Sequence, residues 1–402
     1  MSQLTPLTVY AWSKSSVPRE LSNESIAEIE LSGLGDVLAS PEGGHTIRTT
    51  SYVGVLVTDE IELRVVPHLP VHRLMFLLGY AKDPNGWKRL VTTFEKVDDL
   101  VSAIASGFSW HATWALDRGV IRGYVHRDER EALLRGRIRF ADQIARGGGL
   151  PVPLEVSYDD FTEDVLENRM LRTAASLVLR LPRLPEPARR RLLRLRSILA
   201  EVSELPIGRA VEAPKITRLN ERYAPALHLA ELILSSASVG SGTGTTASTT
   251  FIFNMNKVFE DFVTIALGDS FARNHGGELK EQVTERKLSE RISLKPDLAW
   301  WRDGHWEAVL DVKYKPLYSE SFPNGDAYQM LAYTLAYGLE KGWLIYAREP
   351  DRESVEHVIS TARKTLVVTA LDVRREPEDL LLEVDRLANR IAASAATLSV
   401  AA

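Results

Sequence analysis

The spacing of apolar residues predicts a β-rich domain at the start of the chain. Two β-prone runs at 52–57 and 61–66 flank a short polar segment, which predicts a hairpin. Further β-prone runs lie at 7–12, 120–125 and 136–140, and helical spacings at 72–80 and 98–116. We therefore expect a mixed, β-rich N-terminal domain over residues 1–150.

Helical spacing dominates the middle of the chain. Apolar residues follow a helical period over 165–178, and Thr162 is the expected N-cap of this helix. A second helix carries the arginine-rich run at 189–196. The stretch 235–250 is rich in Gly, Ser and Thr, which is typical of a flexible loop. Residues 151–250 are therefore predicted to form a helical linking region.

The arginine-rich run allows two interpretations, and the sequence does not decide between them. It contains five arginines between Arg189 and Arg196. They can be the solvated side of an amphipathic helix whose apolar side is Leu192, Leu193, Leu195 and Leu199. Alternatively, they contact phosphate groups, for which the guanidinium is well shaped.

Helices and strands alternate in the last part of the chain, which predicts an α/β domain with a mixed sheet over residues 251–402. In chain order we expect a helix at 254–267, a strand at 292–301, a strand at 306–314, a helix carrying Gln329 and Tyr333, strands at 343–347 and 366–371, and a helix at 378–393. The first strand is broken at Pro296-Asp297.

Composition excludes several classes of protein. The chain has 402 residues, a net charge of −5 and no cysteine. The lack of cysteine rules out disulfides, thiolate-bound metals and thiol nucleophiles. The net charge means that nucleic acid would be held by local patches or by a partner. The glycines at 240–244 lack the Gly-Lys-Ser/Thr ending of a Walker A motif, so no nucleotide site is expected. No membrane span or signal segment is visible, and a cytoplasmic location is expected.

Strand periodicity brings two charged residues to one face of the strand at 306–314. Asp311 and Lys313 point to the same side, while Leu310 and Val312 point to the other. Burying such charges is costly unless they are paired or bind something. If the preceding strand is an antiparallel neighbour, Asp297 comes close to Asp311.

Paired carboxylates of this kind predict a metal site. They repel each other unless a divalent cation lies between them, and ligation by oxygen alone suits Mg²⁺. We expect Asp297 and Asp311 to bind Mg²⁺, with Glu260 from the preceding helix completing the metal shell. The ion would bind a scissile phosphate and acidify a water molecule. Lys313 would orient or help deprotonate that water and stabilise the developing charge.

The specificity of this pattern lies in the combination. Asp-x-Lys alone is common and is ordinarily an edge-strand ion pair. Here Pro296-Asp297, a turn, and an apolar strand ending Asp311-Val312-Lys313 precede a helix with Gln329 and Tyr333 four residues apart. Gln329 is expected on the helix face near the site and joins the catalytic candidates. For this Gln–Tyr pair, ordinary helix surface and core stay an open alternative.

The residues at the site resemble the PD-(D/E)XK nuclease superfamily, written here as Pro296-Asp297 and Asp311-Val312-Lys313. The chain resembles more closely the McrC family, the nuclease subunits of McrBC 5-methylcytosine restriction systems. The likeness covers roughly residues 110–350. The blocks that carry it upstream are Leu134-Arg135-Gly136-Arg137-Ile138, residues 158–164, Glu167-Asn168-Arg169 and residues 255–262.

The resemblance implies a fold and a division of labour. It implies a restriction-endonuclease-like C-terminal domain, with Asp297, Asp311 and Lys313 catalytic and Glu260 a less secure metal ligand. It also implies a McrB-like AAA+ GTPase hexamer as partner, which recognises modified double-stranded DNA in antiphage defence. The N-terminal domain would dock on that partner and stimulate GTP hydrolysis, and this chain would cut the DNA. Dimerisation through DNA or partner rings is left open.

Two other functions stay open. The first is a stand-alone DNA repair nuclease of the RecB type, which shares the Gln-x-x-x-Tyr helix. The second is an adaptor that activates a partner NTPase and whose nuclease site is vestigial. The intact set of Asp297, Asp311 and Lys313 argues against the second reading.

Overall fold

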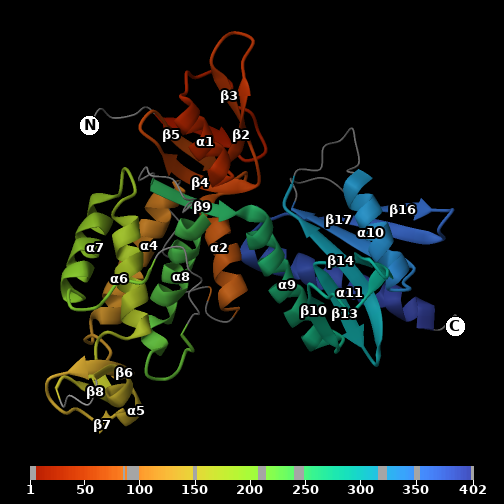
Figure 1. Cartoon of the computed structure of the whole chain (residues 1–402). Helices are drawn as coiled ribbons and strands as arrows, with labels where there is room; N and C mark the ends of the chain where they lie inside the picture. The colour runs from red at the N-terminus through yellow and green to blue at the C-terminus, as the bar shows by residue number, and fades with distance from the viewer. Residues whose placement is uncertain are drawn as a thin grey trace. The chain divides into compact units, whose positions relative to one another are not determined.

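A computed structural model of the chain describes residues 6–84, 87, 99–147, 152–206, 214–239, 249–315, 324–347 and 354–399. It is a mixed α/β protein with several sheets, as expected (Figure 1). The chain divides into two compact units, one of residues 1–103 and 245–402 and the other of residues 104–244. The predicted boundary at 250 lies close to the unit boundary at 244–245, and neither unit begins or ends at 150. The Gly-rich segment at 240–248 lies outside the described residues.

A four-stranded sheet joins the two sequence segments of the first unit. Its order is β1 (Pro6–Tyr10), β5 (Glu62–Val66), β4 (Tyr52–Val57) and β9 (Thr249–Asn254). β4 and β5 form the predicted antiparallel hairpin. β9 comes far later in the sequence, pairs antiparallel with β4, and leads directly into the next helix. The N-terminal segment and the C-terminal segment thus fold around one sheet.

Three short elements near the N-terminus are not indicated by the spacing of apolar residues. They are helix α1 (Asn23–Ser32) and the paired strands β2 (Gly35–Ala39) and β3 (His45–Thr49). Of the apolar residues in α1, only Ile29 is buried, so its amphipathic pattern is weak. Its N-cap, Ser22, accepts a hydrogen bond from the Ser25 N–H at 3.3 Å.

Two helices of the first unit pack through aromatic rings. Helix α2 (Val71–Lys82), expected from the spacing at 72–80, contacts helix α9 (Met255–Asn274). The ring centroids of Phe76 and Phe262 lie 5.6 Å apart, and the Tyr80 hydroxyl donates to Asp269 at 3.1 Å. The helix expected at 254–267 is confirmed as part of α9, and its Phe259 and Phe262 are fully buried.

The C-terminal segment forms a six-stranded mixed sheet. Its order is β10 (Glu278–Glu281), β13 (Leu298–Arg302), β14 (His305–Lys313), β15 (Lys341–Ala347), β17 (Lys364–Leu371) and β16 (Val355–Ile359). β14, β15 and β17 run parallel, and the other pairings are antiparallel. The predicted strand at 292–301 is two strands, because β12 (Ile292–Ser293) pairs with β11 (Lys287–Ser289) in a separate hairpin.

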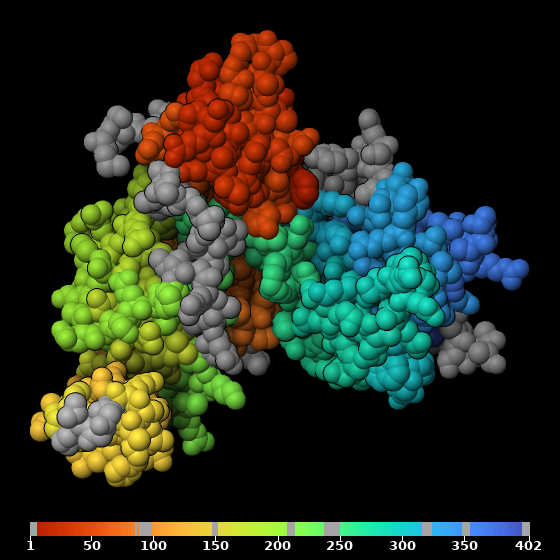
Figure 2. Space-filling model, in the orientation of Figure 1, coloured from red at the N-terminus to blue at the C-terminus, as the bar shows by residue number. Residues whose placement is uncertain are grey.

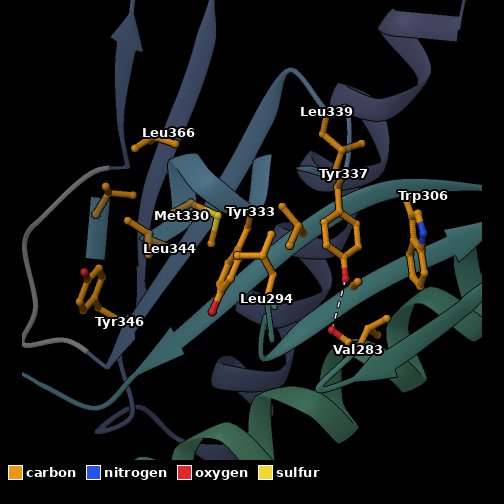
Figure 3. Close-up of a cluster of buried hydrophobic side chains, with 13 residues drawn as sticks. Val283, Leu294, Trp306, Met330, Tyr333, Tyr337, Leu339, Leu344, Tyr346 and Leu366 are labelled. Carbon is orange, nitrogen blue, oxygen red and sulfur yellow. Dashed lines mark hydrogen bonds between the residues drawn. The ribbon is translucent and has the colours of Figure 1, made fainter. Parts of the chain in front are cut away.

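Both faces of this sheet are covered. Helix α10 (Asn324–Ala336) packs its Met330 and Tyr333 into a buried cluster with Val309 and Leu344 (Figure 3). On the other face, Trp300 stacks on Phe271 of α9 with centroids 4.4 Å apart. Helix α11 (Pro377–Ser399) also contacts the sheet. Asp311 and Lys313 share the Val309 face by strand periodicity, so they lie on the side that α10 covers.

The second unit is mainly helical. It contains most of α4 (Leu100–Leu116), together with α6 (Leu166–Val178), α7 (Glu186–Ile198), the 3₁₀ turn η1 (Glu221–Tyr223) and α8 (Ala224–Val239). A small sheet has the order β6 (Gly123–Glu131), β8 (Leu154–Thr162) and β7 (Arg137–Ile138). Helix α5 (Phe140–Gly147) contacts β8.

Several expectations for this unit are wrong in detail. Thr162 does not cap a helix, because β8 extends through it in antiparallel pairing with β6, and α6 begins only at Leu166. The expected strand at 136–140 is reduced to Arg137–Ile138. In α7 the five arginines are exposed as expected, but Leu193 is exposed too, at 49%. The buried side of α7 includes Leu192 and Leu195.

Among the residues that the structure describes, no helix combines the length and the apolar character needed to cross a membrane.

The pairing of β4 with β9 predicts a cost for any side chain at Gly54. This residue has φ +143°, and an added Cβ would lie 1.9 Å from the carbonyl oxygen of Phe251. The clashing atom belongs to the backbone of the paired strand and cannot move aside as a flexible side chain could. Gly54→Ala should therefore lower the free energy of unfolding by at least roughly 2 kcal/mol. Denaturant melts of the purified chain measure this. The control is Gly268→Ala in α9, where a Cβ meets nothing within 4 Å; it should stabilise by up to about 1 kcal/mol. Equal effects of the two variants would contradict the account.

Candidate metal centre

Asp311 is a buried carboxylate whose oxygens lack well-aligned hydrogen bonds. It lies near the end of β14, between β13 and β15, and its side chain is fully buried. Neither carboxylate oxygen accepts a well-aligned hydrogen bond within the described part of the chain. Buried polar atoms almost always have hydrogen-bond partners, so a carboxylate whose oxygens lack well-aligned ones has capacity left for a ligand.

Asp297 is brought to Asp311 by the pairing of β13 with β14. Leu298 is opposite Leu310, so one step further in this register Asp297 is opposite Asp311. The Asp297 side chain is mostly buried, and its Oδ2 accepts a hydrogen bond from the Val312 N–H at 2.8 Å. That bond holds the Asp297 carboxylate against the strand that carries Asp311.

Lys313 is close to both carboxylates. Its Nζ lies 2.8 Å from Asp311 Oδ2 and 3.8 Å from Asp297 Oδ2. Burial alone would lower the pKa of Lys313, but the charges of Asp311 and Asp297 outweigh it and raise that pKa. Lys313 is therefore a cation at neutral pH, suited to stabilising negative charge rather than to removing a proton.

The electrostatics of the pair favour a bound cation. Burial is the larger cause and the nearby charge of Asp297 the next; against the opposing charge of Lys313 they raise the pKa of Asp311 to about 7. One ammonium group thus does not offset the burial of two carboxylates. A divalent cation would supply the missing charge, and a donor set of carboxylate oxygens suits Mg²⁺. The residues present therefore fit the predicted metal.

Glu260 lies at the margin of this site. Burial and the charge of Asp297 raise the pKa of Glu260, and Gln282 Nε2 donates to its Oε1 at 3.4 Å. Within the described ranges, however, no group of three or more His, Asp or Glu side chains is arranged to hold a metal ion. The structure therefore brings Asp297, Asp311 and Lys313 together, with Glu260 near Asp297 but outside any such cluster.

Gln329 and Tyr333 are hydrogen-bonded to each other and to the backbone that precedes Asp297. The two residues lie one turn apart on α10, and Gln329 Nε2 donates to the Tyr333 hydroxyl at 2.7 Å. That hydroxyl donates to the carbonyl of Lys295 at 3.0 Å. Because Lys295 precedes Pro296-Asp297, the pair holds the backbone that carries Asp297 into the site.

A second ion pair lies beside the site, and the sequence patterns did not predict it. Lys315 Nζ lies 2.6 Å from Asp326 Oδ2, in the first turn of α10, and the Tyr346 hydroxyl donates to the same oxygen at 2.5 Å. The charge of Asp326 also contributes to the raised pKa of Lys313. Strand periodicity could have indicated Lys315, which follows Asp311 and Lys313 at the same spacing of two. Asp326 carries no such signal.

The raised pKa of Asp311 predicts how stability depends on pH. Between about pH 4 and pH 7 the folded chain binds a proton that the unfolded chain has lost, so the free energy of unfolding of the metal-free protein should fall as pH rises. Asp311→Asn should remove that loss and raise stability at pH 8 by roughly 1–3 kcal/mol. Thermal melts at pH 5.5 and pH 8 measure both effects.

Added Mg²⁺ provides the control for this prediction. It should raise the melting temperature of the unaltered chain more at pH 8 than at pH 5.5, because the ion competes with the proton for the carboxylates. It should leave Asp311→Asn nearly unchanged. An equal Mg²⁺ shift in both proteins would show that the ion binds elsewhere.

Comparisons with known proteins identify the family of the chain. The family described as "McrBC 5-methylcytosine restriction system component" matches residues 47–347. No curated protein matches the chain. Among solved structures, a chain of the refined half-complex from the tetradecameric assembly of Thermococcus gammatolerans McrB AAA+ hexamers with bound McrC is similar. The identity is 17%, the match covers 96% of this chain and 100% of that one, and the TM-score is 0.60.

A chain of the cryo-EM structure of the Thermococcus gammatolerans McrBC complex matches at 19% identity, over 66% of this chain and 88% of that one, with a TM-score of 0.41. The first of these structures shows a shared fold over nearly the whole length of both chains. The family match spans most of the sequence, from the N-terminal sheet to the strand after the candidate site. The chain therefore belongs to the family of McrBC 5-methylcytosine restriction system components.

Proposed function

We propose that this chain is the Mg²⁺-dependent DNA endonuclease subunit of a modification-dependent restriction system of the McrBC type. The observation that carries the proposal is the buried, unsatisfied carboxylate of Asp311, with Asp297 opposite and Lys313 beside it. Family membership supports the restriction role, and the site supports the chemistry. In this proposal the chain works with an AAA+ GTPase whose hydrolysis it stimulates.

The architecture around the site supports a PD-(D/E)XK assignment. A helix, α9, precedes the antiparallel pair β13 and β14, and the helix α10 then leads to the parallel strand β15. Asp297 directly precedes β13, and Asp311 and Lys313 lie on β14. This order brings two carboxylates and an ammonium group to one end of a twisted sheet, as metal-dependent phosphodiester cleavage requires.

The mechanism divides between the metal and the side chains. Asp297 and Asp311 would hold Mg²⁺, which when bound supplies Lewis-acid activation of the scissile phosphate and of the attacking water. Lys313, cationic beside the carboxylates, stabilises the negative charge that develops on the phosphorus oxygens. Gln329 and Tyr333 keep the Lys295 backbone in place, and with it the Asp297 carboxylate.

DNA recognition and energy are assigned to the partner. The net charge of −5 gives the chain no bulk attraction for DNA. In the related Thermococcus gammatolerans assembly, McrB AAA+ hexamers carry bound McrC. By this likeness, the present chain would be delivered to double-stranded, modified DNA by an AAA+ hexamer.

The small sheet of the second unit is the surface that we assign to partner docking. Tyr124 is 77% exposed and packs against Phe161, with ring centroids 5.0 Å apart. Phe140 and Ile144, one turn apart on α5, are also exposed. This surface, coloured orange to yellow in Figure 2, falls largely within the residues 1–150 to which docking is assigned. Exposed aromatic side chains in such density mark interaction sites.

The first prediction distinguishes DNA cleavage from stimulation of the partner GTPase. Asp311→Ala should abolish Mg²⁺-dependent cleavage of methylated plasmid, a loss of at least about 100-fold, because the metal loses its buried ligand. Stimulation of the partner GTPase should be unchanged, because Asp311 lies in the nuclease sheet. The control is Asp303→Ala, in an exposed turn of the same domain with 82% of its side chain exposed. Cleavage by Asp311→Ala at the rate of the unaltered chain would refute the site.

The same assay separates the proposal from a stand-alone repair nuclease. Cleavage is measured with and without the AAA+ GTPase and GTP, on methylated and unmodified plasmid. The proposal expects cutting only when partner, GTP and methylation are all present. Equal cutting by the purified chain alone on both plasmids would favour the stand-alone enzyme.

A second prediction tests the docking surface. Replacing both Tyr124 and Phe161 by Ser should weaken binding to the AAA+ partner by at least about tenfold, since buried aromatic anchors dominate interfaces. GTPase stimulation should fall in parallel, and the Mg²⁺-dependent shift in melting temperature should persist. Leu219→Ser, at a residue 87% exposed outside this sheet, serves as control. Unchanged affinity in the double variant would rule the surface out.

A further inference from the structure

The residue that follows the strand carrying Asp311 and Lys313 is held by hydrogen bonds from side chains outside the sheet. β14 ends at Lys313, and the buried Tyr314 follows. The Tyr314 N–H donates to Asn256 Oδ1 at 3.2 Å, and Trp12 Nε1–H donates to the Tyr314 carbonyl at 3.1 Å. Both peptide groups that flank Tyr314 are thus held, and the first of them is attached to Lys313.

Each of these two anchors is itself held by the N-terminal segment. Asn256 lies in the first turn of α9, and its Nδ2 donates to Ser51 Oγ at 3.0 Å. Trp12 has φ 56°, a left-handed conformation that is uncommon for a bulky residue, and its N–H donates to the Thr50 carbonyl at 3.1 Å. Such a backbone persists only where its surroundings impose it, and it is often found at functional sites.

The side chain of Tyr314 is held by the same segment. Its ring packs edge-on against Phe259, with centroids 6.3 Å apart, and its hydroxyl is hydrogen-bonded by the backbone of His68. His68 Nε2 in turn lies 2.8 Å from the carbonyl oxygen of Ala11, the residue before Trp12. Residues 11–12 therefore restrain Tyr314 from two directions, at its carbonyl and, through His68, at its hydroxyl.

We propose that Trp12 and Asn256 are positioning residues of the nuclease: by fixing the peptides around Tyr314 they hold Lys313 where the scissile phosphate will lie. Both residues are hydrogen-bonded to the backbone of Tyr314, so in this proposal both act through Tyr314. The inference rests on the proposed nuclease function. It also assigns the N-terminal segment a part in the chemistry in addition to any contact with a partner.

The geometry explains why this role would affect rate more than binding. Lys313 is restrained at two points. Its ammonium group contacts Asp311 at 2.8 Å, and the peptide group that joins its backbone to Tyr314 is hydrogen-bonded to Asn256. Loss of the second leaves the metal ligands Asp297 and Asp311 in place. A misplacement of a catalytic group by about 1 Å can cost roughly 100-fold in rate.

The test is Trp12→Phe, which removes the indole N–H and keeps most of the apolar ring. Single-turnover cleavage of methylated duplex DNA is measured with the AAA+ partner, GTP and Mg²⁺. The rate constant should fall by about 10- to 100-fold, while the reaction amplitude, the KM for DNA and the Mg²⁺ shift in melting temperature stay near those of the unaltered chain. Trp114→Phe, at an exposed tryptophan of α4, is the matched control.

A merely structural role would give a different result: partial unfolding lowers the concentration of active protein, so the rate constant at saturating protein would stay unchanged. Asn256→Ala provides an independent variant, and a double variant should slow cleavage by less than the product of the two single effects, since both act through Tyr314. Rate constants equal to that of the unaltered chain in both single variants would overturn the inference alone. A complete lack of cleavage by the unaltered chain with its partner would overturn the proposed function, and this inference with it.

Discussion

The burial of the Asp311 carboxylate is the constraint on which the rest of the site depends. β14 has a neighbouring strand on each edge and helices on both faces of its sheet. The Asp311 side chain is therefore inaccessible to solvent. Asp297 adds a second negative charge opposite it, and Lys313 supplies only one positive charge. A fold that retains this imbalance gives up stability at neutral pH, and this cost is the electrostatic basis of the proposed cation site.

The surrounding structure can be understood as the means of keeping that site in register. α10 covers the charged face and, through Tyr333, fixes the Lys295 backbone next to Asp297. The N-terminal sheet reaches the same site from the other direction. Its strand β9 runs into α9, which carries Asn256, and Trp12 follows its strand β1; both residues are hydrogen-bonded to Tyr314. The first hundred residues and the C-terminal segment therefore form one folding unit, in which a change near the N-terminus can alter the geometry at Lys313.

Local patterns predicted the parts of the site that are local in sequence. Alternation along 306–314 was sufficient to predict that Asp311 and Lys313 share a face, and the 2.8 Å contact between them confirms it. The pairing of β9 with β4 and the contact of Trp12 with Tyr314 join residues far apart in sequence, and no local periodicity encodes them. At Thr162 a capping signal was misleading, because cross-strand pairing with β6 outweighed the local preference. Asp326 was missed because its role depends on Lys315 and Tyr346 meeting it in space.

The most direct test of the central claim is a crystal structure of the chain soaked in Mn²⁺, with anomalous diffraction recorded at the manganese edge. Mn²⁺ takes the same oxygen ligands as Mg²⁺ and can be identified without ambiguity. We expect an anomalous peak within roughly 2.2 Å of carboxylate oxygens from both Asp297 and Asp311, and no such peak in Asp311→Asn. A saturated soak with no peak between these two side chains, or with an undiminished peak in Asp311→Asn, would contradict it.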